Sequence, residues 1–175
     1  SLPPGSQTRH GKLASALHTT IDYRETAPAA MTSDWFEADP DPDAPTHGGK
    51  AVGTPGHVAG MLFALEKFGT MSRERVVQPA IDLARKGFNA DAHYVKNSQE
   101  VIEWLTATPT YPGAEKARPR LDRFAYTWDR YLHKGAIKVG DRVNNAEQAR
   151  VLEAVLARGA DGFYKGDVAR AIVDA

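Results

Sequence analysis

The chain has 175 residues, of which 42% are hydrophobic and 25% charged, so it is long enough for one compact domain or for a part of a larger one. Its 22 basic and 22 acidic residues cancel to zero net charge and are interleaved along the chain, which argues against a nucleic-acid-binding protein. The lack of cysteine excludes disulfides, thiolate zinc sites and a cysteine nucleophile, and the lack of an apolar run of roughly 20 residues predicts no membrane span.

The first third of the chain is predicted to hold one strand and a long loop. Residues 1–12 are rich in proline, glycine and polar side chains and predict an irregular start, whereas residues 13–22 are compatible with a strand. We expect residues 25–28 to stay extended, because a proline disfavours the helical conformation of the residue before it. The proline- and glycine-rich residues 39–49 predict a surface loop.

Two helices are predicted next. We expect Thr54 to cap the first helix and Gly69 to end it in the left-handed conformation. Ser72 is expected to cap the second helix, which ends at Gly87 and which Pro79 should kink or shift. Because the connection between them is short, the two helices are predicted to form a hairpin.

The rest of the chain is predicted to be helical, apart from a proline-containing loop over residues 106–119. Asn145, with Gln148 three residues later, resembles the start of a capped helix. Apolar side chains at helical spacing predict helices over residues 92–107, 121–132, 145–159 and 167–173. Helices therefore dominate, and the residues alone predict a mainly α protein.

Residue types that bind metals form no complete pattern. The six histidines never pair at the four-residue spacing that zinc motifs use, so we expect no metal and no cofactor. Asp39, Asp41 and Asp43 resemble the start of a calcium-binding loop. Ala44 and Lys50 stand where that loop requires glycine and glutamate, which favours a solvated loop instead.

Signatures of nucleophilic catalysis and phosphate binding are also absent from the sequence. No serine has the flanking glycines of a hydrolase elbow. Ser1 could act as an N-terminal nucleophile, but prolines rather than a buried strand follow it. Residues 53–56 have too few glycines, and no following lysine, for a nucleotide-phosphate loop.

Arg24 remains as a candidate binding residue. It follows the predicted strand and precedes a proline-restricted turn. A guanidinium on such a rigid backbone can present two parallel N–H donors to a carboxylate, which lysine cannot do. The alternative is an internal ion pair with Asp22 or Glu25, and the residues themselves leave both interpretations open.

Five segments together resemble the large subunit of γ-glutamyltransferases. Their order and spacing cover the chain from about residue 20 to its end, although the central part diverges. The segments are DYRETAPA at residues 22–29, AVGTPGHVAG at residues 51–60, FGTM at residues 68–71, QPAIDLA at residues 78–84 and GFYKG at residues 162–166.

This resemblance implies an α+β fold, the αββα sandwich of the N-terminal-nucleophile hydrolases. Residues 1–175 are then a mostly helical large-subunit portion of one such domain, which a separate small subunit from the same precursor completes. The resemblance further implies that a threonine on the small subunit forms an acyl-enzyme with glutathione or another γ-glutamyl compound. It assigns Arg24 as the ligand of the substrate α-carboxylate. Family members are usually exported, so a periplasmic or secreted location is expected.

Departures from the family pattern define what this chain lacks. Thr19 and Thr20 are followed by Ile21 rather than by the histidine of the family's cleavage point, so we expect no catalytic nucleophile in this chain. It resembles a large subunit that is incomplete at both ends and inactive alone. The alternatives are a cephalosporin or glutaryl acylase, a poly-γ-glutamate-processing enzyme, and a non-catalytic helical interaction module.

Overall fold

The computed structural model describes residues 19–37, 39–110, 113–116 and 119–174. Within these residues the chain is mostly helical, as the helical periodicity predicts. It also contains one sheet of two short strands, which the sequence analysis does not predict. The elements in chain order are η1 (Gly49–Ala51), α1 (His57–Phe68), α2 (Arg73–Lys86), β1 (Phe88–Asn89), α3 (Ala92–Thr106), η2 (Ala114–Lys116), α4 (Arg120–Arg123), α5 (Ala125–Arg130), η3 (His133–Gly135), β2 (Arg142–Val143), α6 (Ala146–Arg158), α7 (Asp161–Tyr164) and α8 (Asp167–Val173).

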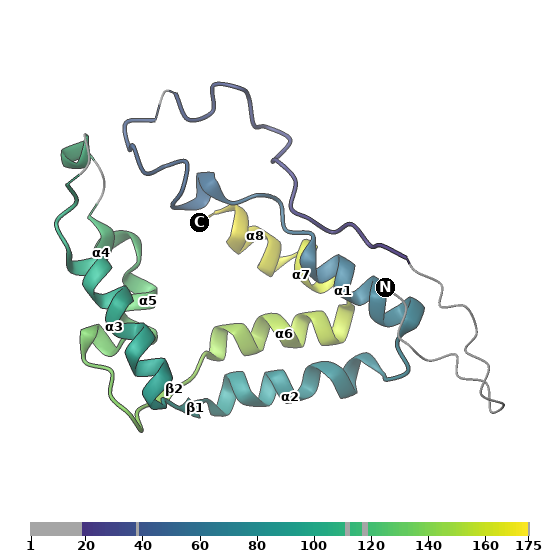
Figure 1. Ribbon diagram of the computed structural model, residues 1–175. Helices are drawn as coiled ribbons and strands as arrows, with labels where there is room; N and C mark the ends of the chain where they lie inside the picture. Colours follow the sequence, from purple (N-terminus) through teal and green to yellow (C-terminus); the bar gives the residue numbers. More distant parts are fainter. Residues whose placement is uncertain (1–18, 38, 111–112, 117–118, 175) are drawn as a thin grey trace.

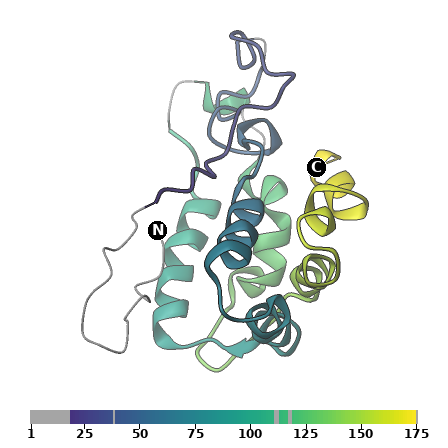
Figure 2. The same cartoon turned by 90° about the vertical axis from the view of Figure 1, so that its right-hand side faces the viewer.

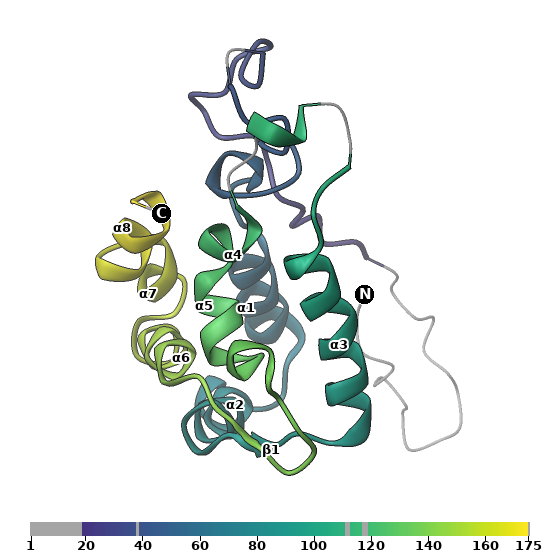
Figure 3. The ribbon, with the colours of Figure 1, turned by 90° about the vertical axis from the view of Figure 1, so that its left-hand side faces the viewer.

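The helices form two groups. In Figure 1, α3, α4 and α5 lie on the left, whereas α1, α2, α6, α7 and α8 lie on the right. The antiparallel strands β1 and β2 lie at the base between the groups, where Phe88 pairs with Val143. Figures 2 and 3 view the molecule from opposite sides and show the loop that precedes η1 extending above both groups. Of the helices that the structure describes, none has the length and apolar character needed to cross a membrane.

The strand predicted over residues 13–22 is not confirmed. Residues 13–18 lie outside the described residues, and residues 19–22 form no strand. Three of these last four side chains are exposed, so this segment has no apolar face to bury against a neighbouring strand. Among the described residues, the first β-type pairing along the chain is an isolated antiparallel bridge between Thr26 and Thr54.

Helix α1 begins later and ends differently than predicted. Thr54 does not cap it, because its backbone pairs with Thr26, and the N-cap residue is Gly56. Gly69 ends the helix as expected, but in an extended conformation with φ of −75° rather than a left-handed one. A glycine is needed there because a Cβ atom would lie 2.4 Å from the carbonyl oxygen of Leu65.

Helix α2 follows the prediction at both ends but packs against a different partner. The Ser72 side chain accepts a hydrogen bond from the Arg75 N–H, and Gly87 ends the helix with φ of +74°. The helix runs through Pro79 without interruption. Its main packing partner is α6, not α1, so the predicted α1–α2 hairpin is wrong. Figures 1 and 3 show α2 and α6 side by side.

Buried side chains explain this pairing. Ile81 of α2 is almost fully buried, as are Ala149 and Val155 of α6. An ion pair between Arg85 and Glu153 joins the exposed edges of the two helices. A second cluster, formed by Ala90, Ile137 and Val143 with surrounding aromatic and aliphatic side chains, lies beside the two strands. The apolar stripe of α2 is therefore buried by a helix about 70 residues further along the chain, which local periodicity cannot reveal.

The helix predicted over residues 121–132 is broken into α4 and α5. The break falls at Phe124, whose φ of −112° and ψ of 26° are not helical. The Phe124 ring packs against Trp104 at 5.3 Å and against His47 at 5.8 Å between ring centroids. These two contacts, to α3 and to the loop before η1, outweigh the local helical preference at Phe124.

The other helix predictions are confirmed. Helix α3 ends at Thr106, one residue before the predicted end, and η2 is a single turn within the predicted loop. The Asn145 side chain accepts a hydrogen bond from the Gln148 N–H at 2.9 Å and caps α6, which ends before Gly159. Helix α8 spans Asp167–Val173, the range predicted.

Candidate functional site

The candidate site begins with the segment around Arg24, which lies against the turn that precedes α1. The Thr54 N–H donates to the Thr26 carbonyl at 2.8 Å, and the Thr26 N–H donates to the Thr54 carbonyl at 3.3 Å. These two bonds fix one end of the segment. The structure thereby brings together two of the sequence segments that carry the family resemblance, residues 22–29 and 51–60.

Three glycines allow this close approach. A Cβ atom on Gly56 would lie 2.4 Å from the Tyr23 carbonyl oxygen, and one on Gly60 would lie 2.4 Å from the Tyr23 Cβ. A Cβ atom on Gly53 would lie 2.9 Å from the Glu25 side chain. Because real Cβ atoms do not approach other atoms this closely, only glycine fits at Gly56 while the Tyr23 backbone keeps its place.

Tyr23 also packs sideways against the start of α1. Its ring meets the His57 ring edge to face, with 5.5 Å between the centroids and an angle of 71° between the planes. Such aromatic contacts add roughly 0.5–1.5 kcal/mol beyond the area that they bury. The residue before Arg24 is therefore held both through its backbone and through its side chain.

Arg24 itself projects into solvent. Its side chain is 84% exposed, and its Nη2 donates to the Glu25 Oε1 at 2.7 Å. The Arg24 N–H donates to the Asp22 Oδ1 at 3.2 Å, which orders the backbone locally. Arg24 thus forms an internal ion pair with Glu25. An exposed pair of this kind contributes about 0–1 kcal/mol, so a ligand can displace it.

A third segment of the resemblance reaches the same place. Tyr164, from residues 162–166, donates its hydroxyl to the Pro55 carbonyl at 2.8 Å and accepts a hydrogen bond from the Ala59 N–H at 3.2 Å. The remaining two segments serve packing instead. Residues 68–71 form the end of α1 and the turn after it, and residues 78–84 belong to α2 and include the buried Ile81.

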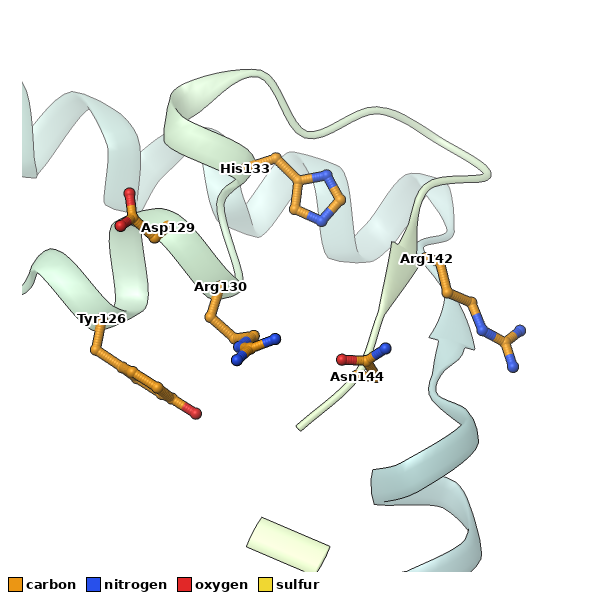
Figure 4. A pocket seen from close by; sticks show the side chains of 6 residues that line it. All are labelled: Tyr126, Asp129, Arg130, His133, Arg142 and Asn144. Atoms are coloured by element: carbon orange, nitrogen blue, oxygen red, sulfur yellow. The ribbon is translucent and has the colours of Figure 1, made fainter. Parts of the chain in front are cut away.

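A polar cavity lies in another part of the molecule. It has a volume of about 530 Å³ and is lined by Tyr126, Asp129, Arg130, His133, Arg142 and Asn144, but not by Arg24 (Figure 4). Arg130 and His133 point toward the same space, whereas the Asp129 carboxylate turns away. The sequence gives no signal for this cavity, because its residues belong to no motif and come from separate segments.

Internal partners occupy the charged groups beside this cavity. Arg130 pairs with Glu147 at 3.4 Å, and His133 lies 3.4 Å from Asp141. A hydrogen bond from its own backbone N–H lowers the pKa of Glu147, and Arg130 lowers it further. Burial raises the pKa of Tyr126, and the nearby Glu147 carboxylate adds to this rise.

The acidic loop that resembles a calcium site is neutralised by an arginine. Arg123, with a side chain only 7% exposed, lies 2.5 Å from Asp41 and 3.6 Å from Asp43. Lys50 pairs with Asp39 at 2.6 Å. Among the described residues no three histidine, aspartate or glutamate side chains gather as a metal site. His10 and His18 lie outside the described residues.

The gamma-glutamyltranspeptidase family model matches residues 12–175. The chain therefore belongs to the gamma-glutamyltranspeptidase family. A glutathione hydrolase proenzyme from Pseudomonas sp. (strain A14) is 38% identical over 167 residues, which are 93% of this chain and 26% of that protein. The glutathione hydrolase proenzyme of Escherichia coli (strain K12) is 37% identical over 158 residues, which are 88% of this chain and 25% of that protein.

The fold is also similar to that of solved family members. The crystal structure of Helicobacter pylori gamma-glutamyltranspeptidase superposes with a TM-score of 0.68 at 29% identity, covering 86% of this chain and 40% of that one. This chain spans about a quarter of the length of the curated relatives that it matches.

Proposed function

We propose that this chain is part of the large subunit of an enzyme that hydrolyses or transfers γ-glutamyl groups, and that Arg24 binds the α-carboxylate of the γ-glutamyl donor. Residues 1–175 form a portion of one αββα domain, which a small subunit from the same precursor completes. Two relatives described as proenzymes support cleavage of a precursor. We also propose a periplasmic or secreted location for this enzyme.

The observation that carries this proposal is an exposed guanidinium on a firmly held backbone. The bridge between Thr26 and Thr54 and the close contacts of Tyr23 fix the segment on both sides of Arg24. Preorganised donors bind a ligand with less loss of conformational entropy. Apart from the pair with Glu25, the guanidinium donors of Arg24 have no partner among the described residues. They can therefore take up a carboxylate in the planar two-bond geometry.

In the proposed reaction the threonine hydroxyl of the small subunit attacks the γ-carbonyl carbon of the donor, and the threonine α-amine accepts the hydroxyl proton. The C–N bond breaks, and the departing amine takes up a proton. Water or the amine of an amino acid or peptide then attacks the acyl-enzyme ester and releases the threonine. Arg24 transfers no proton but holds the donor so that its γ-carbonyl faces the nucleophile. The isolated chain is therefore inactive.

The substitution Arg24→Lys in the full-length enzyme tests this role. Lysine keeps the charge but loses the fork geometry, so we expect KM for γ-glutamyl-p-nitroanilide to rise roughly tenfold, or about 1.4 kcal/mol. The donor γ-aminobutyryl-p-nitroanilide lacks the α-carboxylate, and its KM should not change. Arg170→Lys is the matched control, because Arg170 is also exposed and also pairs with a nearby carboxylate, Asp167.

An unchanged KM for the γ-glutamyl donor would remove Arg24 from the site. Glutaryl-p-nitroanilide keeps the acid group but lacks the α-amine, and it tests the acylase alternative. An acylase should turn over this compound at least as fast as γ-glutamyl-p-nitroanilide. A full-length protein that remains one uncleaved, inactive polypeptide would favour the helical interaction module instead.

A further inference from the structure

The N-terminus of α1 has no capping side chain at its own N-cap position. The first four N–H groups of a helix lack partners within the helix, and a side chain at the N-cap position normally accepts a hydrogen bond from the third residue. The N-cap residue here is Gly56, which has no side chain. It cannot be replaced by a capping residue, because a Cβ atom there would lie 2.4 Å from the Tyr23 carbonyl oxygen.

Tyr164 supplies the missing cap from the far end of the chain. Its hydroxyl accepts a hydrogen bond from the N–H of Ala59, the third residue of α1, at 3.2 Å. The same hydroxyl donates to the carbonyl of Pro55, the residue before the N-cap, at 2.8 Å. One hydroxyl therefore forms hydrogen bonds on both sides of the turn. The turn contains Gly56, which packs against the Tyr23 backbone.

The helices behind Tyr164 hold its side chain in place. Gly162 is buried, and a Cβ atom on it would lie 1.9 Å from the Ala154 carbonyl oxygen, so α7 lies directly against α6. The ring of Phe163 packs edge to face on the ring of Tyr164 at 5.0 Å. Helix α6 in turn packs along α2 (Figure 1). The tyrosine thus connects the packed helices to the turn under Arg24.

We infer that Tyr164 is a positioning residue for Arg24: it caps α1 in place of the side chain that Gly56 cannot carry, and so holds the turn on which the Tyr23–Arg24 backbone lies. This inference rests on the proposed function of Arg24. Without the hydroxyl, the Pro55 carbonyl and the Ala59 N–H lose their shared partner and the turn gains freedom. The guanidinium then samples more positions, and donor binding weakens.

The substitution Tyr164→Phe in the full-length enzyme removes the hydroxyl and keeps the ring. We expect KM for γ-glutamyl-p-nitroanilide to rise about three- to tenfold with a much smaller change in kcat, and KM for γ-aminobutyryl-p-nitroanilide to stay unchanged. Tyr94→Phe is the matched control, because the Tyr94 hydroxyl also donates to a distant backbone carbonyl, that of Tyr131, at 3.1 Å. It should lower Tm by a similar amount and leave both KM values unchanged.

A double-mutant cycle with Arg24→Lys separates positioning from general stability. If Tyr164 acts through Arg24, the double variant should raise KM by clearly less than the product of the two single effects. Two results would overturn the inference: a KM in the double variant equal to the product of the two single effects, or a KM in Tyr164→Phe equal to that in the control Tyr94→Phe. In either case a raised KM in Arg24→Lys would still uphold the proposed function. An unchanged KM in Arg24→Lys would overturn the proposed function and this role of Tyr164 with it.

Discussion

Two regions of the molecule use charged side chains in opposite ways. Around Arg24 the backbone is held by close contacts at glycines, and the charged end of the side chain remains in solvent. In the central region, which we define as α4, α5 and the carboxylates that pair with them, charged ends meet one another, as Arg123 meets Asp41. The contrast fits the proposed role of Arg24, whose guanidinium is exposed and pairs only with the neighbouring Glu25 among the described residues, whereas the side chain of Arg123 is buried against its carboxylate partners.

The largest expected effect concerns the stability of the central region. Arg123→Met leaves Asp41 and Asp43 without their buried partner, which should lower the free energy of unfolding by about 3 kcal/mol. KM for the γ-glutamyl donor should not change. Urea-induced unfolding and steady-state kinetics of the full-length enzyme measure the two quantities. A raised KM would contradict the division between the two regions.

A smaller effect, on binding rather than stability, is expected at the turn before α1. Gly56→Ala forces the Tyr23 backbone away from the turn and should raise KM for the γ-glutamyl donor roughly tenfold, about the effect of one lost charge-assisted hydrogen bond. Gly140→Ala is the control, because a Cβ atom there meets nothing within 4 Å although φ is +93°. This control should cost about 1–2 kcal/mol of stability and leave KM unchanged. Equal KM values in both variants would argue against the close packing at Gly56.

The smallest effect is a pH dependence in the central region. The pKa of Glu147 is lowered from its ordinary value of 4.5, so its charged form stabilises the fold fully above that pH, and the contribution is lost as the pH falls through the lowered pKa. Glu147→Gln should therefore lower Tm slightly at pH 7, and the difference from the unsubstituted enzyme should shrink below about pH 4.5. Thermal unfolding across this range measures the difference. A constant difference down to acid pH would mean that the charge of Glu147 has no part in it.

Features that depend on neighbouring residues could be predicted from the sequence. Ser72 and Asn145 cap their helices because each side chain reaches an N–H group three residues away. Gly87 ends α2 because its positive φ suits glycine. These signals are complete within one turn of chain, and no distant contact overrides them.

Features that depend on distant contacts could not be predicted. The pairing of α2 with α6, the break at Phe124 and the cap from Tyr164 each join residues far apart in the sequence. Resemblance to a family identifies Arg24 and the segment that contains Tyr164. Only the structure shows that these two segments meet at the same turn.

In the proposed role of Arg24, the carboxylate of Glu25 competes with the carboxylate of a ligand for the guanidinium. Because the two side chains are sequence neighbours on an immobilised stretch of backbone, the glutamate is a tethered competitor with a high effective concentration. A donor carboxylate that binds Arg24, as proposed, displaces the Glu25 carboxylate at a cost of about 0–1 kcal/mol. Selectivity among carboxylate ligands must therefore come from other groups of the ligand, and a simple monocarboxylate should bind poorly.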